Sequence, residues 1–245
     1  MNINEIALFK HSSFNIGDSV YYTLRKNIVA LNLKPGEALS IKDISDQWNV
    51  SRSPVRDALI KLEKEGLVDI IPQKGTIVSK IDLKRVAEER FLRESLEEHA
   101  VREFIKTYKE SDIAILRHYI EMQLQSLKDN DYTSFLAFDD SFHSVFFKSI
   151  DKNMCWEIIE SMSGHYKRIR LMSLWDEKIL SNVVLQHQEV LENICNNNLE
   201  GAVEILRKHL TKISTEEMEL LEKYPDYFKE QDHHNLTAKS FYGTI

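Results

Sequence analysis

Three histidines and one aspartate in the second half of the chain have the residue types of a metal site. Asp139 and His143 are four residues apart, so in a helix their side chains project from one face. Asp140 is three residues from His143 and could also face it. His187 and His209 each lie in a later apolar helical pattern, and groups on three helices can converge on one divalent cation. Spacing alone supports this weakly, because a histidine on an apolar helical face is more often a hydrogen-bonded core residue.

The chemistry of this candidate site leaves several metals and three roles open. Imidazole-rich sites suit zinc, nickel, iron or copper, and we take zinc as the first expectation. The ion could bind a ligand, stabilise the fold only, or activate water as in a metalloenzyme. The chain has no H-E-x-x-H motif that would place a glutamate as general base, so we do not expect an enzyme.

A second group of residues, near the N-terminus, has the types that contact nucleic acid. Arg52 and Arg56 are four residues apart at the start of a predicted helix, so they share a face. Arginine is well suited to bidentate contact with guanine in the major groove. Ser51 and Ser53, with the free N–H groups of the helix start, can meet phosphates. Taken singly, the arginines would more often be solvated surface charges.

Two further basic positions fit the same interpretation. Lys42, in the preceding predicted helix, could reach a phosphate. Lys74 and Gly75 place a cation beside a glycine at a predicted hairpin tip, which suits entry into a minor groove.

The elements that must position these basic residues are short and closely spaced. Apolar periodicity predicts helices that begin near Asp18, after Ser40 and after Ser51. Two β-prone runs follow, 67–71 and 76–79, joined by a turn. A helix-turn-helix followed by such a hairpin is a winged helix-turn-helix, whose second helix meets base edges through its N-terminal residues.

The rest of the chain carries the candidate metal ligands and is helical in pattern. Short polar breaks separate six apolar periodic segments, which suggests an antiparallel bundle. The fold class is therefore mainly α, with residues 1–80 as a winged helix-turn-helix domain, 81–230 as a helical effector-binding and dimerisation domain, and 231–245 as a polar tail. The predicted helices are 83–107, 111–129, 132–149, 153–174, 179–197 and 199–223.

Charge and composition agree with this division. The net charge is −7, but residues 1–80 carry 11 basic and 9 acidic side chains, and residues 81–245 carry 21 and 30. A mildly basic domain on an acidic one suits a DNA-binding unit joined to one that need not touch DNA. No apolar run approaches the ~20 residues of a membrane span, and the N-terminus lacks a signal-peptide pattern. We expect a cytoplasmic protein without membrane association, with its two cysteines reduced.

Four stretches of residues 33–75 give the N-terminal domain a resemblance to the GntR family of bacterial transcription regulators. The resemblance implies that Arg52 and Arg56 contact bases, that Lys42 occupies a DNA-contact position, and that Gly75 marks the wing tip. This chain departs from the family pattern at one place, since the family often has glycine near Leu31 and Asn32. The departure affects only the local turn. The stretches are L-K-P-G-E-A-L, V-S-R-S-P-V-R-D-A-L, L-E-K-E-G-L-V and P-Q-K-G.

The helical domain resembles the FCD type of ligand-binding domain found in one branch of that family. The matching features are R-E-S-L-E at 93–97, D-D-S-F-H at 139–143, and the two later histidines. In metal-binding members of the branch, one aspartate and three histidines hold the ion, which here selects Asp139, His143, His187 and His209. The resemblance also implies small organic acids as effectors.

An arginine would suit the carboxylate of such an effector. Arg93 is the first candidate and Arg168 and Arg170 follow, although each such arginine is more often a surface or interhelix residue. His165 could line the cavity or lie on a wet helix face.

The sequence therefore predicts a DNA-binding transcription regulator, with repression as the expected sign. We expect a homodimer on a double-stranded DNA operator, since a two-fold protein matches a two-fold site. A metalloenzyme with a DNA-binding domain, and a regulator with a purely structural metal, are the alternatives.

Overall fold

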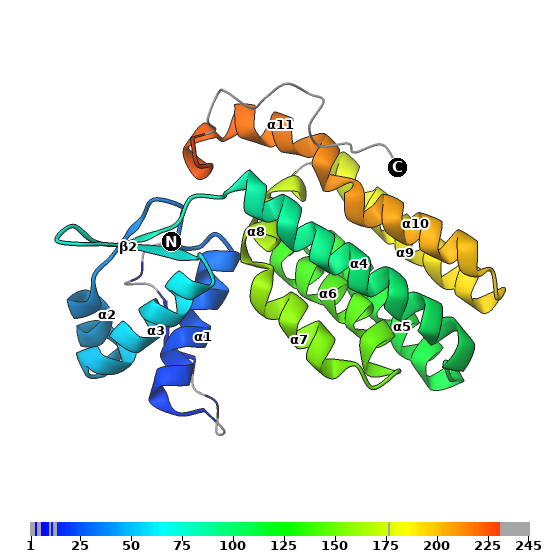
Figure 1. Ribbon diagram of the computed structural model, residues 1–245, viewed down its shortest axis with the longest axis horizontal. Coiled ribbons are helices and arrows are strands. Elements are labelled where there is room, and N and C mark those ends of the chain that lie inside the picture. Colours follow the sequence, from blue (N-terminus) through cyan, green and yellow to red (C-terminus); the bar gives the residue numbers. More distant parts are fainter. Residues whose placement is uncertain (1–2, 4–5, 10, 12–13, 176, 231–245) are drawn as a thin grey trace.

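The computed structural model describes residues 3, 6–9, 11, 14–175 and 177–230 as two packed domains (Figure 1). The polar tail expected at 231–245 lies outside the described residues. The elements of the N-terminal domain are α1 (Ile16–Val29), β1 (Ala38–Leu39), α2 (Ile41–Trp48), α3 (Arg52–Lys64), β2 (Val68–Ile71) and β3 (Gly75–Val78).

The winged helix-turn-helix is confirmed, and its turns are set by local signals. Ser40 Oγ accepts the backbone N–H of Asp43 and caps α2 (3.2 Å). Asn49 ends α2 with φ of 50°, and Gly66 follows α3 with φ of 73°. The sheet has the order β1-β3-β2 and is antiparallel. The two-residue β1 was not predicted, because it exists only through its pairing with β3.

The helical domain is a bundle with more breaks than its periodicity predicted. Its elements are α4 (Leu83–Thr107), α5 (Glu110–Lys128), α6 (Tyr132–Lys148), α7 (Asn153–Met162), α8 (Gly164–Ser173), α9 (Glu177–Cys195), α10 (Leu199–Thr211) and α11 (Ile213–Lys223), followed by a 3-10 turn at Pro225–Tyr227. Two predicted helices, 153–174 and 199–223, are each divided in two. No helix of the described residues is long and apolar enough to cross a membrane.

The break between α7 and α8 has a tertiary cause. Glu89 of α4 accepts the backbone N–H groups of His165 and Tyr166 (2.9 and 2.8 Å), which the new helix start leaves without helical partners. Gly164 packs against the N-terminal domain so closely that a Cβ there would lie 2.6 Å from Leu67 Cδ2. The contact with the other domain therefore favours a second helix at this point.

Each domain has its own apolar core, and one residue of the N-terminal domain packs into the core of the helical domain. Leu31 follows α1 but belongs to the core cluster of the helical domain. It adopts a left-handed conformation, with φ of 57°, at the position where the GntR pattern often has glycine. Its side chain is buried, so packing against the helical domain accounts for a leucine here.

Helix α8 occupies the end of the bundle nearest the N-terminal domain (Figure 1). All ten of its residues are buried, including His165, Lys167, Arg168 and Arg170. A buried helix with this many polar groups must satisfy them through its neighbours. These polar side chains therefore bind neighbours in both domains.

Candidate metal centre and nucleic-acid interface

The structure brings the four predicted metal ligands together inside the bundle. One ligand atom from each of Asp139, His143, His187 and His209 lies within 4.8 Å of all the others. Helix α6 supplies Asp139 and His143 one turn apart, α9 supplies His187, and α10 supplies His209. Three of the four are fully buried and His209 is nearly so.

The histidine rings are oriented by polar groups behind them. His187 Nδ1–H donates to Gln123 Oε1 (2.8 Å), and His209 Nδ1–H donates to Gln186 Oε1 (3.2 Å). His143 Nδ1–H donates to the carboxylate of Glu97. The glutamine amide oxygens only accept hydrogen bonds, and the Glu97 carboxylate does so when it is ionised beside Arg93. The proton of each neutral ring then lies on Nδ1 and leaves Nε2 with a free lone pair.

The three Nε2 atoms face one another. The separation is 3.1 Å from His143 to His209, 3.2 Å from His143 to His187 and 3.4 Å from His187 to His209. Three converging lone pairs without a proton between them repel, and a cation among them removes the repulsion. A tetrahedral site with Zn–N bonds of about 2.0–2.1 Å has N···N separations of about 3.3 Å. The donor set therefore fits a divalent transition metal.

Charge states in the cluster also suit a metal. Burial lowers the pKa of His187 to about 3 and holds the pKa values of His143 and His209 well below the ordinary value, so all three rings are neutral at neutral pH. Burial opposes ionisation of Asp139, but the neighbouring positive charges, Arg170 foremost, together outweigh it and keep the Asp139 pKa below its usual range. The site thus offers three neutral imidazoles and one carboxylate.

Asp140, the alternative ligand from sequence, has a different role. Its Oδ1 accepts from Arg170 Nη1 (2.8 Å) and Arg93 Nη1 (3.3 Å). Its Oδ2 pairs with Lys167 Nζ (2.9 Å). Asp140 therefore anchors cations beside the cluster while Asp139 faces the histidines.

A small cavity of about 40 Å³ adjoins the cluster. It is lined by Asp139 and His209 and by Tyr166, Arg170 and Ser173 of α8, among others. Arg170 also ion-pairs with Asp139. Of the three arginines predicted to contact an effector, Arg170 alone lines this cavity.

Arg93 lies behind the cavity wall. Its side chain is fully buried, and its Nε donates to Glu97 Oε2 (3.1 Å) while Nη1 contacts Asp140. This places the Arg93 charge near the cluster without exposing it to the cavity.

Arg168 and His165 lie at the junction between the domains, and Arg168 does not line the cavity beside the metal cluster. Arg168 Nη1 donates to Ser79 O (2.6 Å), at the end of the wing. His165 Nε2–H donates to Gly66 O (2.9 Å), and its Nδ1 accepts the N–H of Asp82 in the linker (3.0 Å). Helix α8 thus lines the cavity beside the metal cluster. It also binds the end of α3, the recognition helix, and the base of the wing.

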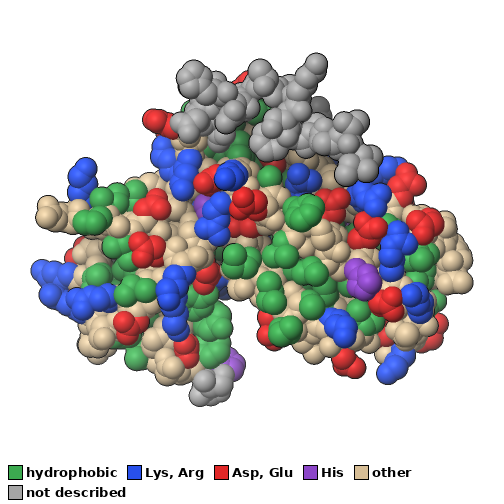
Figure 2. Space-filling view, viewed as in Figure 1, with side chains coloured by type: hydrophobic (Ala, Val, Ile, Leu, Met, Phe, Trp, Pro, Cys, Tyr) green, Lys and Arg blue, Asp and Glu red, His purple; other side chains and the backbone are tan. Residues whose placement is uncertain are grey.

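The predicted nucleic-acid contacts form an exposed surface on the N-terminal domain. Lys42 on α2 and Arg52 and Arg56 on α3 are exposed and have no ion-pair partner among the residues that the structure describes. Figure 2 shows Lys and Arg side chains gathered at the end of the molecule formed by α2 and α3. Ser51 and Ser53 are exposed at the start of α3, where backbone N–H groups are free.

The wing extends beside this surface. Lys74 and Gly75 are exposed at its tip, and Gly75 has φ of 108°. The turn is closed by Lys74 N–H donating to Ile71 O (3.0 Å). Recognition helix and wing tip are thus both available to a groove.

The residues that hydrogen-bond the histidine rings of the metal cluster from behind were not predicted. Glu97, Gln123 and Gln186 come from α4, α5 and α9, and no spacing in the sequence joins them. Glu97 was part of the R-E-S-L-E motif, but its contact with His143 depends on how α4 packs against α6.

A winged helix-turn-helix joined to a helical bundle is the architecture of a DNA-binding transcription regulator. The family model "Bacterial regulatory proteins, gntR family" matches residues 16–78, and "FCD domain" matches residues 90–212. The chain belongs to the GntR family of bacterial transcription regulators, in its FCD-containing branch.

Named relatives agree with this assignment. The HTH-type transcriptional repressor RspR of Escherichia coli K12 is 29% identical over 88% of this chain and 95% of its own. The gluconate operon transcriptional repressor of Bacillus subtilis is 30% identical over 73% of this chain and 77% of its own. The structure of E. coli McbR/YncC aligns with a TM-score of 0.70 and 20% identity, over 86% of this chain and 99% of that one.

Proposed function

We propose that this regulator is a homodimeric repressor whose operator binding is controlled by a small organic acid at a divalent metal, zinc first. The metal would be held by Asp139, His143, His187 and His209. The observation that carries the proposal is the convergence of three histidine nitrogens and a carboxylate oxygen, all within 4.8 Å of one another. We place the domain boundary at residue 80, with the effector domain at 81–230.

The DNA contacts are assigned from position and chemistry. Arg52 and Arg56 would contact base edges in the major groove. Lys42, Ser51 and Ser53 would contact phosphates, and Lys74 with Gly75 would enter the minor groove. The exposure of all seven residues supports this assignment.

An organic acid is supported by the charges around the cavity. The cations Arg93 and Arg170 are already balanced by Asp139 and Asp140, so a bound dication would leave an excess of positive charge that favours an anion. Arg170 lines the cavity and is the proposed carboxylate anchor. The name of the B. subtilis relative refers to a gluconate operon, which fits the class of sugar acids.

Helix α8 would carry the signal. Arg170 and Tyr166 face the cavity, while His165 and Arg168 bind the N-terminal domain. An acid that shifts α8 would change the fraction of molecules whose recognition helices fit the operator.

The test combines metal analysis with gel mobility shift on promoter DNA. The purified protein should contain about one metal per chain, and His187→Ala should lose it. Arg52→Ala and Arg56→Ala should each weaken specific DNA binding by about 1–3 kcal/mol, and the exposed Arg117→Ala is the matched control. Retention of metal by His187→Ala, or of specific binding by the double arginine variant, would contradict the assignment.

A further inference from the structure

A second cavity lies between the two domains. It has a volume of about 230 Å³ and is walled by α1 on one side and by α6 and α8 on the other. This is several times the volume beside the metal cluster, which is about 40 Å³. We refer to it as the interdomain cleft.

The walls of the interdomain cleft are mainly apolar. Val29 of α1 and Ala30, which caps α1, face Leu136 and Ala137 of α6 and Leu171 of α8. Apolar surface in a concave site favours a ligand with an apolar body. Because the cleft is smaller than most drug-sized pockets, a compact ligand such as a one- or two-ring aromatic fits best.

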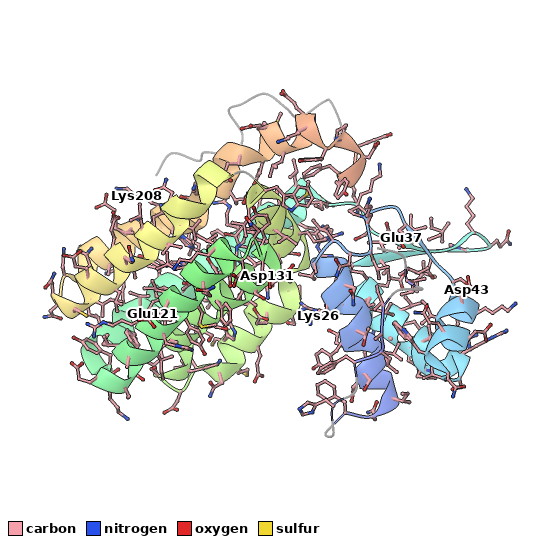
Figure 3. All side chains as sticks on the ribbon, turned by 180° about the vertical axis from the view of Figure 1, so that it is seen from behind. Lys26, Glu37, Asp43, Glu121, Asp131 and Lys208 are labelled. Carbon is pink, nitrogen blue, oxygen red and sulfur yellow. The ribbon has the colours of Figure 1, made fainter. Side chains whose placement is uncertain are left out.

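The charged side chains that line the cleft are three cations, Arg25, Lys26 and Lys167, and one anion, Asp140. Arg25 is held by Glu65 Oε2 (2.8 Å), and Lys167 pairs with Asp140 Oδ2 (2.9 Å). The ammonium of Lys26 is exposed and has no ion-pair or hydrogen-bond partner among the described residues. Figure 3 shows Lys26 on the side of α1 that faces the helical domain. An ammonium with no anionic partner, beside an apolar wall, is suited to a carboxylate.

We propose that the interdomain cleft binds an organic anion with an apolar, aromatic body, with its carboxylate at Lys26. This site is separate from the metal cluster and does not depend on the proposed metal. The ligand would contact both domains at once, and would therefore stabilise this arrangement of recognition helix and bundle over others.

The cleft shares a wall with the metal cavity. Leu136 lines both, and Asp140 joins Lys167 on the cleft side to Arg170 on the cavity side. Occupants of the two sites are thus separated by one layer of side chains. The regulator would integrate two anions, one at the cavity and one at the cleft.

The experiment uses full-length protein and 2-naphthoate as the probe, titrated by its own fluorescence and by calorimetry. The neutral isostere 2-naphthamide reports on the contribution of charge. Lys26→Met removes the ammonium, and Ala137→Trp fills the cleft from an exposed position. Lys128→Met, an exposed lysine on α5, is the matched control. Circular dichroism verifies that each variant is folded.

The expected result is binding of 2-naphthoate that persists in EDTA-treated protein and in His187→Ala. Lys26→Met should weaken it by about tenfold or more, as expected for loss of a charge-assisted contact, and Ala137→Trp should abolish it. Lys128→Met should leave it unchanged, and 2-naphthamide should bind weakly and be insensitive to Lys26→Met. Absence of naphthoate binding, its loss on chelation, or its indifference to both cleft variants would overturn the proposal. Because the chelated protein is used, failure here is distinguishable from failure of the metal assignment.

Discussion

The hydrogen bonds of Arg168 are the most direct test of how the two domains are joined. The side chain is fully buried, and burial lowers the pKa of its guanidinium to about 10. Nη1 donates to Ser79 O (2.6 Å), Nε to Gly164 O (3.2 Å), and Nη2 to Ser79 Oγ (3.3 Å) and His165 Nδ1 (3.1 Å). Arg168→Ala removes these donors together and leaves a void.

The size of the effect follows from these contacts. A buried carbonyl left without a donor costs about 1–3 kcal/mol, and the lost packing adds to it. The alanine variant no longer buries a cation, and the desolvation cost that it avoids offsets part of this loss. We expect Arg168→Ala to lower the free energy of unfolding by about 2–4 kcal/mol, and Arg168→Lys to lower it less, because lysine keeps the charge but not the planar donor geometry.

The assay is urea unfolding followed by two probes. Trp48 lies in the N-terminal domain and Trp156 in the helical domain, so single-tryptophan variants report on each domain separately. The wild-type transitions should coincide, and those of Arg168→Ala should separate, because the domains no longer unfold together. Arg117→Ala, exposed on α5, should change stability by less than about 0.5 kcal/mol.

Function gives a second measurement on the same variant. Because Arg52 and Arg56 are unaffected, Arg168→Ala should keep operator affinity within a few-fold but lose most of its response to the effector acid. If Arg168→Ala unfolded in one transition within about 0.5 kcal/mol of wild type and kept its response, the junction reasoning would be wrong.

Three further predictions test neighbouring features. Gly164→Ala should destabilise the protein by about 1–3 kcal/mol in thermal or urea unfolding, although helix propensity alone predicts a gain, and the loss should shrink in a Leu67→Ala background where the overlap is relieved. His165→Gln tests pH dependence: burial, then the charge of Arg168, depresses the folded pKa of His165 from 6.5 to about 2, so its contribution is complete above pH 6.5 and is lost as pH falls. The stability difference between wild type and His165→Gln should therefore shift against wild type below pH 6.5, by up to about 1.4 kcal/mol per pH unit, and a constant difference from pH 7 to 5 would count against this. Glu97→Gln should weaken metal binding by about 10–100-fold, measured by competition with a chelating dye, while unchanged affinity would exclude an orienting role.

The features that were predictable from sequence depend on neighbours along the chain. The capping of α2 by Ser40, the end of α3 at Gly66 and the shared face of Arg52 and Arg56 follow from helix geometry and local hydrogen bonding. The pairing of Asp139 with His143 on one face is local for the same reason. The distant His187 and His209 were joined to them weakly by their apolar helical patterns, and more specifically by the resemblance to a known family.

The features that were missed depend on which helix packs against which. The helix predicted at 153–174 breaks at Ser163 because Glu89 and Leu67, far away in sequence, meet the start of α8. Arg168 looked like Arg170 in sequence, yet a turn of about 100° per residue sends the two side chains to different neighbours. Arg168 contacts Ser79, and Arg170 lines the cavity beside the metal cluster.

The sequence by itself therefore determined the winged helix-turn-helix, its exposed basic residues and the residue types of a metal site, because spacing along a helix fixes which side chains share a face. Only the tertiary structure decided that Glu97 and the two glutamines orient the histidines, that α8 joins the cavity to the wing, and that a largely apolar cleft lies between the domains. Those contacts join residues tens of positions apart, and their geometry arises from the packing of whole helices.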